Sequence, residues 1–262
     1  MSLLAVETLG ISFGGVVAVD GVSFAVSPGE VFSLIGPNGA GKTTLFNLIT
    51  GIYQPSRGRV LLNGELLTGL APHLLTRRGM SRTFQNLQVF FRMTALENVM
   101  VGCHLLERTS LLADLLALPQ VGRQNRDTRR TAYALLERVG LAEVADVSAG
   151  ALSYGALKRL EIARALAANP KVLLLDEPAA GCNAVETEAI DHLICEIARS
   201  GVAVVLIEHD MKLVMKISDR VLVLAQGKRL AEGPPRLVRD DPAVITAYLG
   251  NHGTREAGRA EG

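Results

Sequence analysis

Residues 36 to 43 read Gly36-Pro37-Asn38-Gly39-Ala40-Gly41-Lys42-Thr43. This run fits the pattern G-x-x-x-x-G-K-[ST] of phosphate-binding loops, in which glycines let backbone N–H groups turn inward around phosphate oxygens. Lys42 would neutralise the phosphates, and the Thr43 hydroxyl would complete the shell of a Mg²⁺ ion. We therefore expect this loop and the following Thr44 to bind a nucleotide triphosphate.

The segments on either side of the loop support this interpretation. The apolar run Val31–Ile35 predicts a strand that enters the loop, and Lys42–Ile49 predicts a helix that leaves it. The N-terminus of such a helix offers free N–H groups and a positive dipole end to phosphates. A glycine-rich turn without a ligand is the alternative, and the lysine, the hydroxyl and both flanking elements favour the phosphate site.

The composition excludes several classes of function. The chain has 262 residues, with 27 Lys and Arg against 26 Asp and Glu, so no overall positive field indicates a nucleic-acid partner. Cys103, Cys182 and Cys195 are too few and too scattered for a disulfide framework or a zinc site. Neither a signal peptide nor an apolar run long enough to span a bilayer is present, so any membrane association is expected to come through a partner.

The apolar runs predict an α/β fold with two kinds of sheet. Residues 172–175 and 202–207 are nearly continuous apolar runs, as in parallel strands covered on both faces. Shorter, more alternating runs predict an N-terminal antiparallel portion over residues 3–7, 22–26 and 60–62. A further hairpin is expected where residues 221–224 are followed by Gln226-Gly227-Lys228.

Strand signals nearly vanish between residues 87 and 164. Helical spacing and caps predict helices over residues 94–106, 126–140 and 153–168. We expect a single domain over residues 1–250, with an α/β core at about 1–86 and 165–250 and an inserted helical subdomain at about 87–164. Residues 251–262 are rich in Gly, Glu and Arg, and predict a disordered tail.

Two carboxylates follow the predicted strand over residues 172–175. Asp176 could hold Mg²⁺ directly or through water, and Glu177 is placed to accept a proton from an attacking water. An Asp-Glu pair after a strand could also cap a helix. The presence of a phosphate loop favours the catalytic interpretation.

Three further motifs carry a resemblance to a known family. They are Leu152-Ser153-Tyr154-Gly155-Ala156 leading into a helix, Ile207-Glu208-His209-Asp210 after a strand, and Arg82-Thr83-Phe84-Gln85. With the phosphate loop, their order resembles that of the ATP-binding cassette (ABC) ATPases, whose signature loop has the form Leu-Ser-Gly-Gly-Gln with frequent Tyr variants. The resemblance extends to Gly250.

The resemblance implies ATP and Mg²⁺ as cofactors, and a head-to-tail dimer that sandwiches two ATP molecules. Ser153, Tyr154 and Gly155 would then meet the γ-phosphate bound by another subunit. Gln85 would sense Mg²⁺ and the attacking water, and His209 would stabilise the γ-phosphate or the water. Phe13 lies where the family stacks an aromatic ring on adenine, although a core role for Phe13 is equally open.

The chain departs from the family pattern at three positions. Ala156 replaces the signature glutamine, while Cys182 and Ala184 stand where close relatives carry Leu and Pro. The segment that contains residues 182 and 184 lies at the dimer interface in the family. These departures put the strength of the dimer in doubt, and leave the family resemblance intact.

Several stretches resemble the ATPase subunits of branched-chain amino acid importers in bacteria and archaea. They cover residues 82–87, 94–99, 208–215 and 243–250. This resemblance implies a second ATPase subunit, two integral membrane permeases, indirectly a solute-binding protein, and a peripheral location at the cytoplasmic face of the membrane. Leu87, Val89, Phe90 and Met93 are candidates for coupling to the permeases, with plain core packing as the alternative.

Other functions remain open at this stage. An importer of urea or short amides is the nearest competitor, because nothing in the chain touches the solute. A lipopolysaccharide-export ATPase is another relative. A soluble ABC ATPase acting on DNA or the ribosome usually carries a coiled coil or a second cassette, neither of which this sequence has. The signature-like loop and His209 argue against a GTPase or kinase, and Glu177 argues against a regulatory module without turnover.

Overall fold

A computed structural model describes residues 2–104 and 119–248. Its strands are β1 (Leu4–Phe13), β2 (Val16–Val26), β3 (Val31–Ile35), β4 (Arg57–Leu62), β5 (Glu65–Leu66), β6 (Met80–Arg82), β7 (Val172–Asp176), β8 (Ala203–Ile207), β9 (Arg220–Ala225) and β10 (Lys228–Gly233). Its helices are α1 (Lys42–Ile49), α2 (Pro72–Arg77), α3 (Ala95–Cys103), α5 (Pro119–Arg138), α6 (Tyr154–Leu166), α7 (Ala184–Arg199), α8 (Met211–Ile217) and α9 (Pro235–Arg239), with short 3₁₀ turns at Ala142–Val144 and Ala149–Ala151.

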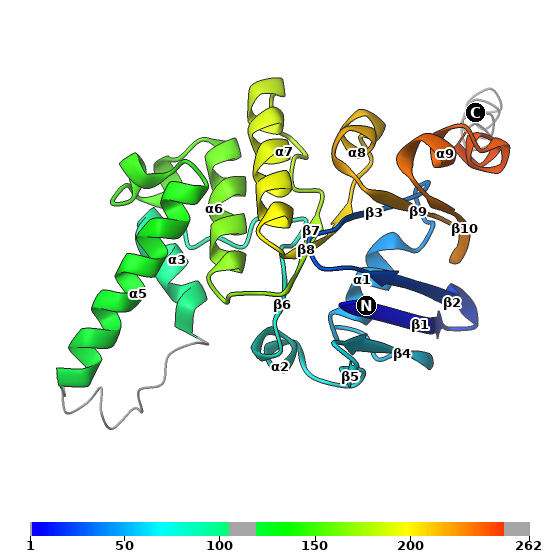
Figure 1. The fold of residues 1–262 in the computed structure, drawn as a ribbon, viewed down its shortest axis with the longest axis horizontal. Helices are drawn as coiled ribbons and strands as arrows, with labels where there is room; N and C mark the ends of the chain where they lie inside the picture. The colour runs from blue at the N-terminus through cyan, green and yellow to red at the C-terminus, as the bar shows by residue number, and fades with distance from the viewer. Residues whose placement is uncertain (1, 105–118, 249–262) are drawn as a thin grey trace.

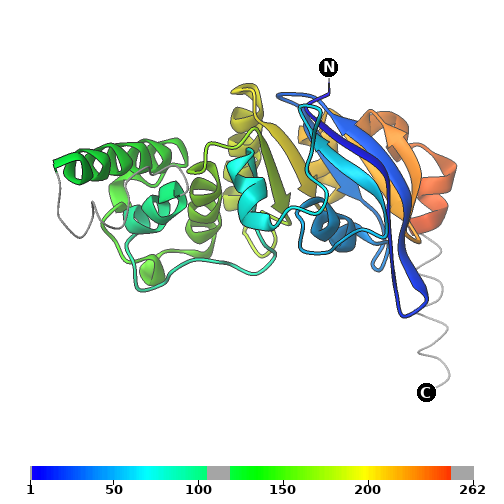
Figure 2. The same ribbon diagram turned by 90° about the horizontal axis from the view of Figure 1, so that it is seen from below.

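The described strands form two sheets, as the sequence predicts. A six-stranded sheet has the order β10-β9-β3-β8-β7-β6, in which every pair is parallel except the terminal β9–β10 hairpin. The four-stranded sheet has the order β2-β1-β4-β5 and is antiparallel throughout. In Figures 1 and 2 this antiparallel sheet lies at one end of the molecule beside α1, while α3, α5 and α6 lie at the other end.

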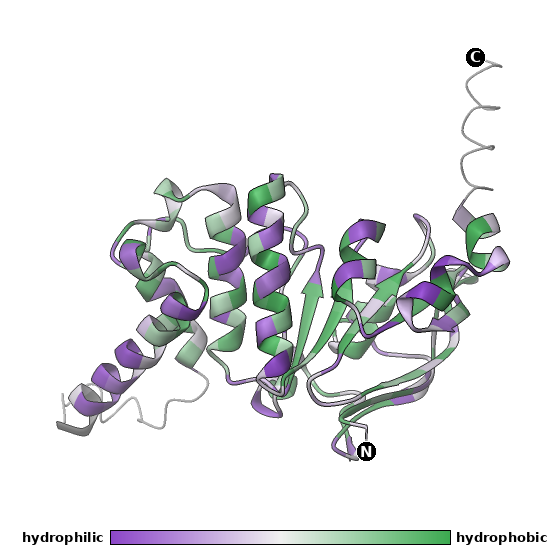
Figure 3. Ribbon diagram, turned by 45° about the horizontal axis from the view of Figure 1, so that its top comes forward, coloured by the Kyte–Doolittle hydropathy of each residue, from purple (hydrophilic) through white to green (hydrophobic). Residues whose placement is uncertain are grey.

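The position of strand β7 in the sheet explains why residues 172–175 form a continuous apolar run. Successive side chains of a strand point to opposite faces of the sheet. Leu173 and Leu175 pack into the cluster that includes α6 and α7, whereas Val172 and Leu174 pack into the cluster on the other face, which includes α1. Both faces are covered, so the four positions from Val172 to Leu175 are all apolar. Figure 3 shows the resulting concentration of hydrophobic residues in the central strands.

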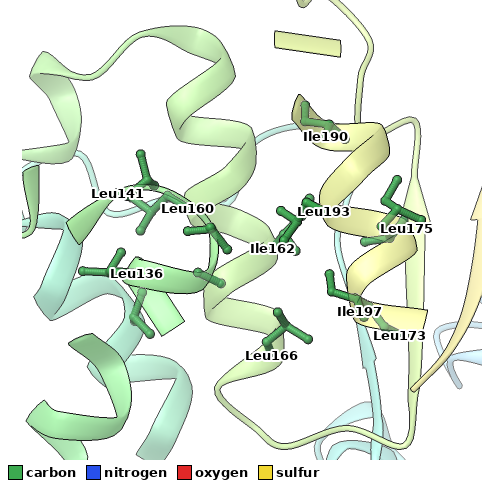
Figure 4. Packing of buried hydrophobic residues seen from close by; sticks show 14 of the residues in the cluster. Leu136, Leu141, Leu160, Ile162, Leu166, Leu173, Leu175, Ile190, Leu193 and Ile197 are labelled. Carbon is green, nitrogen blue, oxygen red and sulfur yellow. The ribbon is translucent and has the colours of Figure 1, made fainter. Parts of the chain in front are cut away.

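The first of these clusters joins the sheet to the helices that cover it. Its side chains come from α5, α6, α7 and β7, as Figure 4 shows for Leu136, Leu160, Ile162, Leu166, Leu173, Leu175, Ile190, Leu193 and Ile197. Each of these side chains is at most 6% exposed. The close packing of these buried side chains fixes α6 and α7 against β7.

The predicted helices between residues 87 and 164 are present, with different bounds. Helix α5 begins at Pro119 rather than at residue 126, because the sequence of residues 119–125 carries little of the apolar periodicity on which the prediction rested. Helix α3 ends at Cys103, and the last two residues of the predicted helix, 105 and 106, lie outside the described residues. The predicted tail at 251–262 also lies outside them.

A buried asparagine holds the segment that precedes α3. The Asn98 side chain is fully buried, and its Oδ1 accepts from the Phe90 N–H at 2.9 Å. Its Nδ2 donates to the carbonyls of Phe90 at 3.0 Å and Thr94 at 2.9 Å. The buried amide therefore ties residues 90 and 94 to the first turn of α3.

We expect Asn98→Ala to lower the free energy of unfolding by about 1–3 kcal/mol, because it removes a fully buried side chain, the acceptor of the Phe90 N–H and the donor to the Phe90 and Thr94 carbonyls. Urea denaturation followed by circular dichroism measures the change. The matched control is Asn86→Ala, whose side chain is exposed, and which should change stability by no more than about 0.5 kcal/mol. Equal losses in the two variants would contradict the role given to Asn98.

Candidate nucleotide site

The loop between β3 and α1 has a backbone shape that requires glycine. Gly36 has φ 151° and Gly41 has φ 99°, values in the region that L side chains rarely adopt. A Cβ atom at Gly36 would lie 2.2 Å from the Leu224 carbonyl oxygen, and one at Gly41 would lie 2.6 Å from that of Ala18. The loop therefore packs closely against β9 and β2, and Gly41 leads directly into α1.

The Lys42 side chain folds back over this loop. Its Nζ donates to the carbonyls of Gly36 at 2.6 Å and Pro37 at 3.1 Å. Burial lowers the pKa of Lys42, and the nearby Glu177 and Asp176 carboxylates act in the opposite direction. The ammonium is thus held at the centre of the loop, where phosphate oxygens could take the place of the carbonyls.

A cavity of about 500 Å³ lies over the loop. It brings together residues that are far apart in the sequence, including the predicted Gln85 and Glu177. Its lining comprises Val16, Val17, Ala18, Asn38, Gly39, Ala40, Gly41, Lys42, Thr43, Thr44, Gln85, Glu177, Ile207, Gln226 and Gly227. Most of the predicted phosphate loop therefore faces one cavity with two of the three predicted catalytic residues.

Parallel pairing explains why these residues meet. Strands β3, β7 and β8 are neighbours, with Leu34 and Asp176 both paired to Ile207. The carboxyl ends of parallel strands lie at one edge of a sheet, where ligands of α/β proteins commonly bind. The phosphate loop follows β3, Glu177 follows β7, and His209 lies just after β8.

Asp176 is buried beside an arginine. Its side chain is 5% exposed, and its Oδ2 lies 3.4 Å from Arg82 Nη2. Burial raises the pKa of Asp176, while Arg82 opposes that shift. Arg82 also donates to Asn47 Oδ1 at 2.9 Å and to Thr50 Oγ1 at 2.8 Å. Arg82 thus ties the end of β7 to helix α1, a link that sequence reasoning missed because no spacing rule pairs these residues.

Glu177 and His209 face each other at the same edge. His209 Nδ1 lies 3.6 Å from Glu177 Oε1. The Glu177 backbone has φ 49°, its N–H donates to the Ile207 carbonyl at 3.0 Å, and Lys158 Nζ donates to its carbonyl at 3.4 Å. A non-glycine residue with this φ is uncommon, and such backbone strain is concentrated at functional sites.

Glu208 is a further polar group that the sequence reasoning did not assign. Its side chain is buried, and it accepts from the backbone N–H groups of Ala179 at 3.4 Å and His209 at 3.2 Å. Burial raises the pKa of Glu208, and these two N–H donors act against that shift. Glu208 therefore joins the loop after β7 to the loop after β8. Its burial could not be read from its place between Ile207 and His209, because a carboxylate directly after a strand is ordinarily exposed.

Tyr248 reaches the phosphate loop from the C-terminal segment. It packs against the small apolar cluster that contains Ile35 and Val223. Burial raises the pKa of Tyr248 to about 12, and the backbone amide of Gly36 opposes this shift. The sequence singled out residues 243–250 only by resemblance, and assigned them no position near the loop.

Other predicted residues lie outside the cavity. The described residues around it do not include Phe13, Asp176, Ser153, Tyr154 or Gly155. The Phe13 ring is 46% exposed and meets Tyr53 edge to face, with ring centroids 5.3 Å apart, so it is not a core residue. Val16 and Val17 line the cavity instead, and sequence reasoning did not select them.

The signature-like loop stands at a different place in the fold. Ser153 caps helix α6, and its Oγ accepts from the Ala156 N–H at 3.3 Å. Figure 1 shows α6 on the opposite side of α7 from α1. The chain therefore has two separate helix N-termini that could meet an anion, one at α1 and one at α6.

Comparison with known protein families establishes the family to which this chain belongs. A family model described as ABC transporter matches residues 19–180. The chain belongs to the ABC transporter family. It is therefore a nucleotide-binding ATPase of that family, and a second model, described as branched-chain amino acid ATP-binding cassette transporter, matches residues 228–254.

Individual relatives agree with this assignment. The chain is 49% identical to the high-affinity branched-chain amino acid transport ATP-binding protein BraF of Pseudomonas aeruginosa, over 95% of this chain and 98% of that protein. It is 47% identical to LivG of Escherichia coli K12, with the same coverage. The lipopolysaccharide export ATP-binding protein LptB of Haemophilus influenzae is 35% identical, also with the same coverage.

Solved structures show the same fold. A nucleotide-free ATP-binding cassette and the ADP conformation of an ATP-binding cassette each give a TM-score of 0.83 at 35% identity, covering 95% of this chain and 99% of that chain. These matches confirm the predicted fold class.

Among residues 2–104 and 119–248, no helix is both long and apolar enough to cross a membrane.

We expect Lys42→Ala to weaken ATP binding by about 10- to 100-fold, because it removes a half-buried cation from the loop that would hold the phosphates. Isothermal titration calorimetry with ATP measures the change. Lys212→Ala removes an exposed lysine and serves as the control, with unchanged affinity. An unaltered affinity in Lys42→Ala would overturn the phosphate-loop assignment.

Proposed function

We propose that this ATPase energises the uptake of branched-chain amino acids through partner membrane subunits. The observation that carries the proposal is the shared cavity, in which the phosphate loop, Gln85 and Glu177 meet, with His209 against Glu177. The substrate class is supported by the 47–49% identity to BraF and LivG, and by the C-terminal family match over residues 228–254. The cytoplasmic face of the membrane is the corresponding location.

Glu177 is the proposed general base for hydrolysis. It lies in the same cavity as the phosphate loop, so its carboxylate can accept a proton from water directed at the γ-phosphorus. His209 would donate to the γ-phosphate or orient the same water, since its Nδ1 stands 3.6 Å from Glu177 Oε1. Lys42 and the loop N–H groups would stabilise the charge that develops on the phosphate oxygens.

The residues present fit a Mg²⁺ ion. Thr43 and Gln85 bring a hydroxyl and an amide oxygen to the cavity, and Asp176 adds a buried carboxylate next to Glu177. Oxygen ligands of this kind suit Mg²⁺, which usually takes only one or two carboxylates and completes its shell with phosphates and water. When bound, the ion would neutralise charge on the β- and γ-phosphates.

The separation of the two helix N-termini supports the proposed dimer. Ser153, Tyr154 and Gly155 do not line the cavity of their own chain. They can act on ATP only if a second ATPase subunit, identical or related, presents its signature loop to this cavity. Phe13 and Tyr53 would offer aromatic surface to adenine at the carboxyl end of β1, where Phe13 pairs with Val16.

A groove next to the glutamine loop is the proposed contact with the permeases. It has a volume of about 430 Å³ and is lined by residues of α2, β6, α3 and α6, together with Phe84 and Gln88 from the segment after β6. Of the four predicted coupling residues, Val89 is buried and Leu87 packs against the core, while Phe90 is 48% and Met93 36% exposed. Phe90 and Met93 are therefore the better candidates. We place them in the proposed helical subdomain over residues 87–164.

We expect Glu177→Gln to bind ATP and remain a dimer, with turnover lowered by about 10²–10⁴-fold, because the amide cannot accept the proton. Phosphate release and sedimentation velocity with ATP test both effects. Glu188→Gln, on the exposed side of α7, is the control and should behave as the unmodified protein. Unchanged turnover together with no dimer would overturn the assignment of Glu177.

The substrate is tested by transport. Proteoliposomes that contain this chain, its second ATPase subunit, both permeases and the solute-binding protein should take up labelled leucine when ATP is inside, and Lys42→Ala should abolish uptake. Labelled urea and acetamide are the competing substrates. Uptake of either one without leucine would move the proposal to an importer of urea or short amides.

A further inference from the structure

A carboxylate occupies the signature loop in this structure. Glu186, near the start of α7, places Oε1 3.2 Å from the Gly155 N and 3.3 Å from Ser153 Oγ. Both groups donate to this one oxygen. The same two groups are the ones that would have to meet the γ-phosphate of an opposing subunit in the proposed dimer.

Each donor can serve one strong acceptor at a time. A backbone N–H has one hydrogen, and a serine hydroxyl has one as well. The Ser153 oxygen already accepts from the Ala156 N–H at 3.3 Å, so its own hydrogen is the one left for Glu186. A γ-phosphate oxygen that takes these hydrogens must therefore displace Glu186 Oε1, and its negative charge repels the carboxylate.

The absence of a side chain at Gly155 lets the Glu186 carboxylate approach the backbone. A Cβ atom at Gly155 would lie 2.4 Å from Glu186 Cδ, so the carboxylate can sit here only because residue 155 is glycine. The second carboxylate oxygen, Oε2, accepts from the Asn183 N–H at 3.2 Å, and the Asn183 side chain accepts from the Glu186 N–H at 3.0 Å. Glu186 thus joins the signature loop to the start of α7, directly after the segment that contains Cys182 and Ala184.

We propose that Glu186 is an internal competitor of ATP at the signature loop, and that its displacement is a step in closing the dimer. We call its hydrogen bonds with Ser153 and Gly155 the Glu186 latch. The latch gives both donors an acceptor while the two subunits are apart. The contact of Oε2 with Asn183 can persist when Oε1 is released, so the carboxylate can turn away without uncapping α7. This inference rests on the proposed dimer.

The test compares the ATP concentration needed for dimer formation in two variants. Glu177→Gln alone gives the reference midpoint by sedimentation velocity. Glu177→Gln with Glu186→Gln should form the dimer at about three- to tenfold lower ATP, because a neutral acceptor holds the two donors roughly half as strongly. Glutamine has a single amide oxygen, so it either holds the two signature-loop donors as a weaker, neutral acceptor or turns that oxygen to the Asn183 N–H and releases them. In both cases the Asn183 side chain still accepts from the backbone N–H of residue 186, so the cap of α7 is kept.

Glu177→Gln with Glu188→Gln is the matched control, because it removes the same charge from the exposed side of the same helix; its midpoint should equal the reference. An unchanged or higher midpoint with Glu186→Gln would overturn the latch. The contact itself is checked in the ATP-free protein by NMR, where Glu186→Gln should shift the Gly155 amide proton upfield, and no shift would also overturn it. If Glu177→Gln alone stays monomeric at saturating ATP, the proposed dimer fails, and the inference fails with it.

Discussion

The parallel pairing of β3, β8 and β7 is the constraint on which the site depends. It places the ends of three strands, distant in sequence, at a single edge of the sheet. The phosphate loop, Glu177 and His209 each follow one of those strands by a few residues. Because the strands are buried on both faces, packing fixes their register. The positions of the loops that follow these strands are fixed as a result.

Buried charges then connect the elements at this edge. Arg82 links Asp176 to α1, and Glu208 links the loops after β7 and β8. A buried charge is costly unless it is paired or hydrogen-bonded. Each of these side chains has partners on a different element, so a movement of one loop affects the others. In the proposed mechanism, these links would carry a change at Glu177 to the glutamine loop.

The two ends of the chain contribute residues at or near the cavity, whereas helix α6 does not. The antiparallel sheet brings Val16 and Val17 to the cavity, and the C-terminal segment brings Tyr248 against Gly36. Helix α6, by contrast, presents its N-terminus away from the cavity and against Glu186. One part of the site is thus assembled within the chain, while Ser153 and Gly155 donate to an internal carboxylate that a second subunit would displace in the proposed dimer.

The sequence alone determined the phosphate loop, the strand before it, helix α1, the two kinds of sheet and the family, because these depend on local pattern and on glycines with a fixed backbone role. Only the tertiary structure decided the pairing of Arg82 with Asp176, the burial of Glu208, the exposure of Phe13 and the contact of Glu186 with Gly155. Those features join residues that are 31 to 94 positions apart, or depend on what covers a side chain. For these polar and aromatic residues, the spacing along the chain indicates neither the partner in space nor the degree of burial.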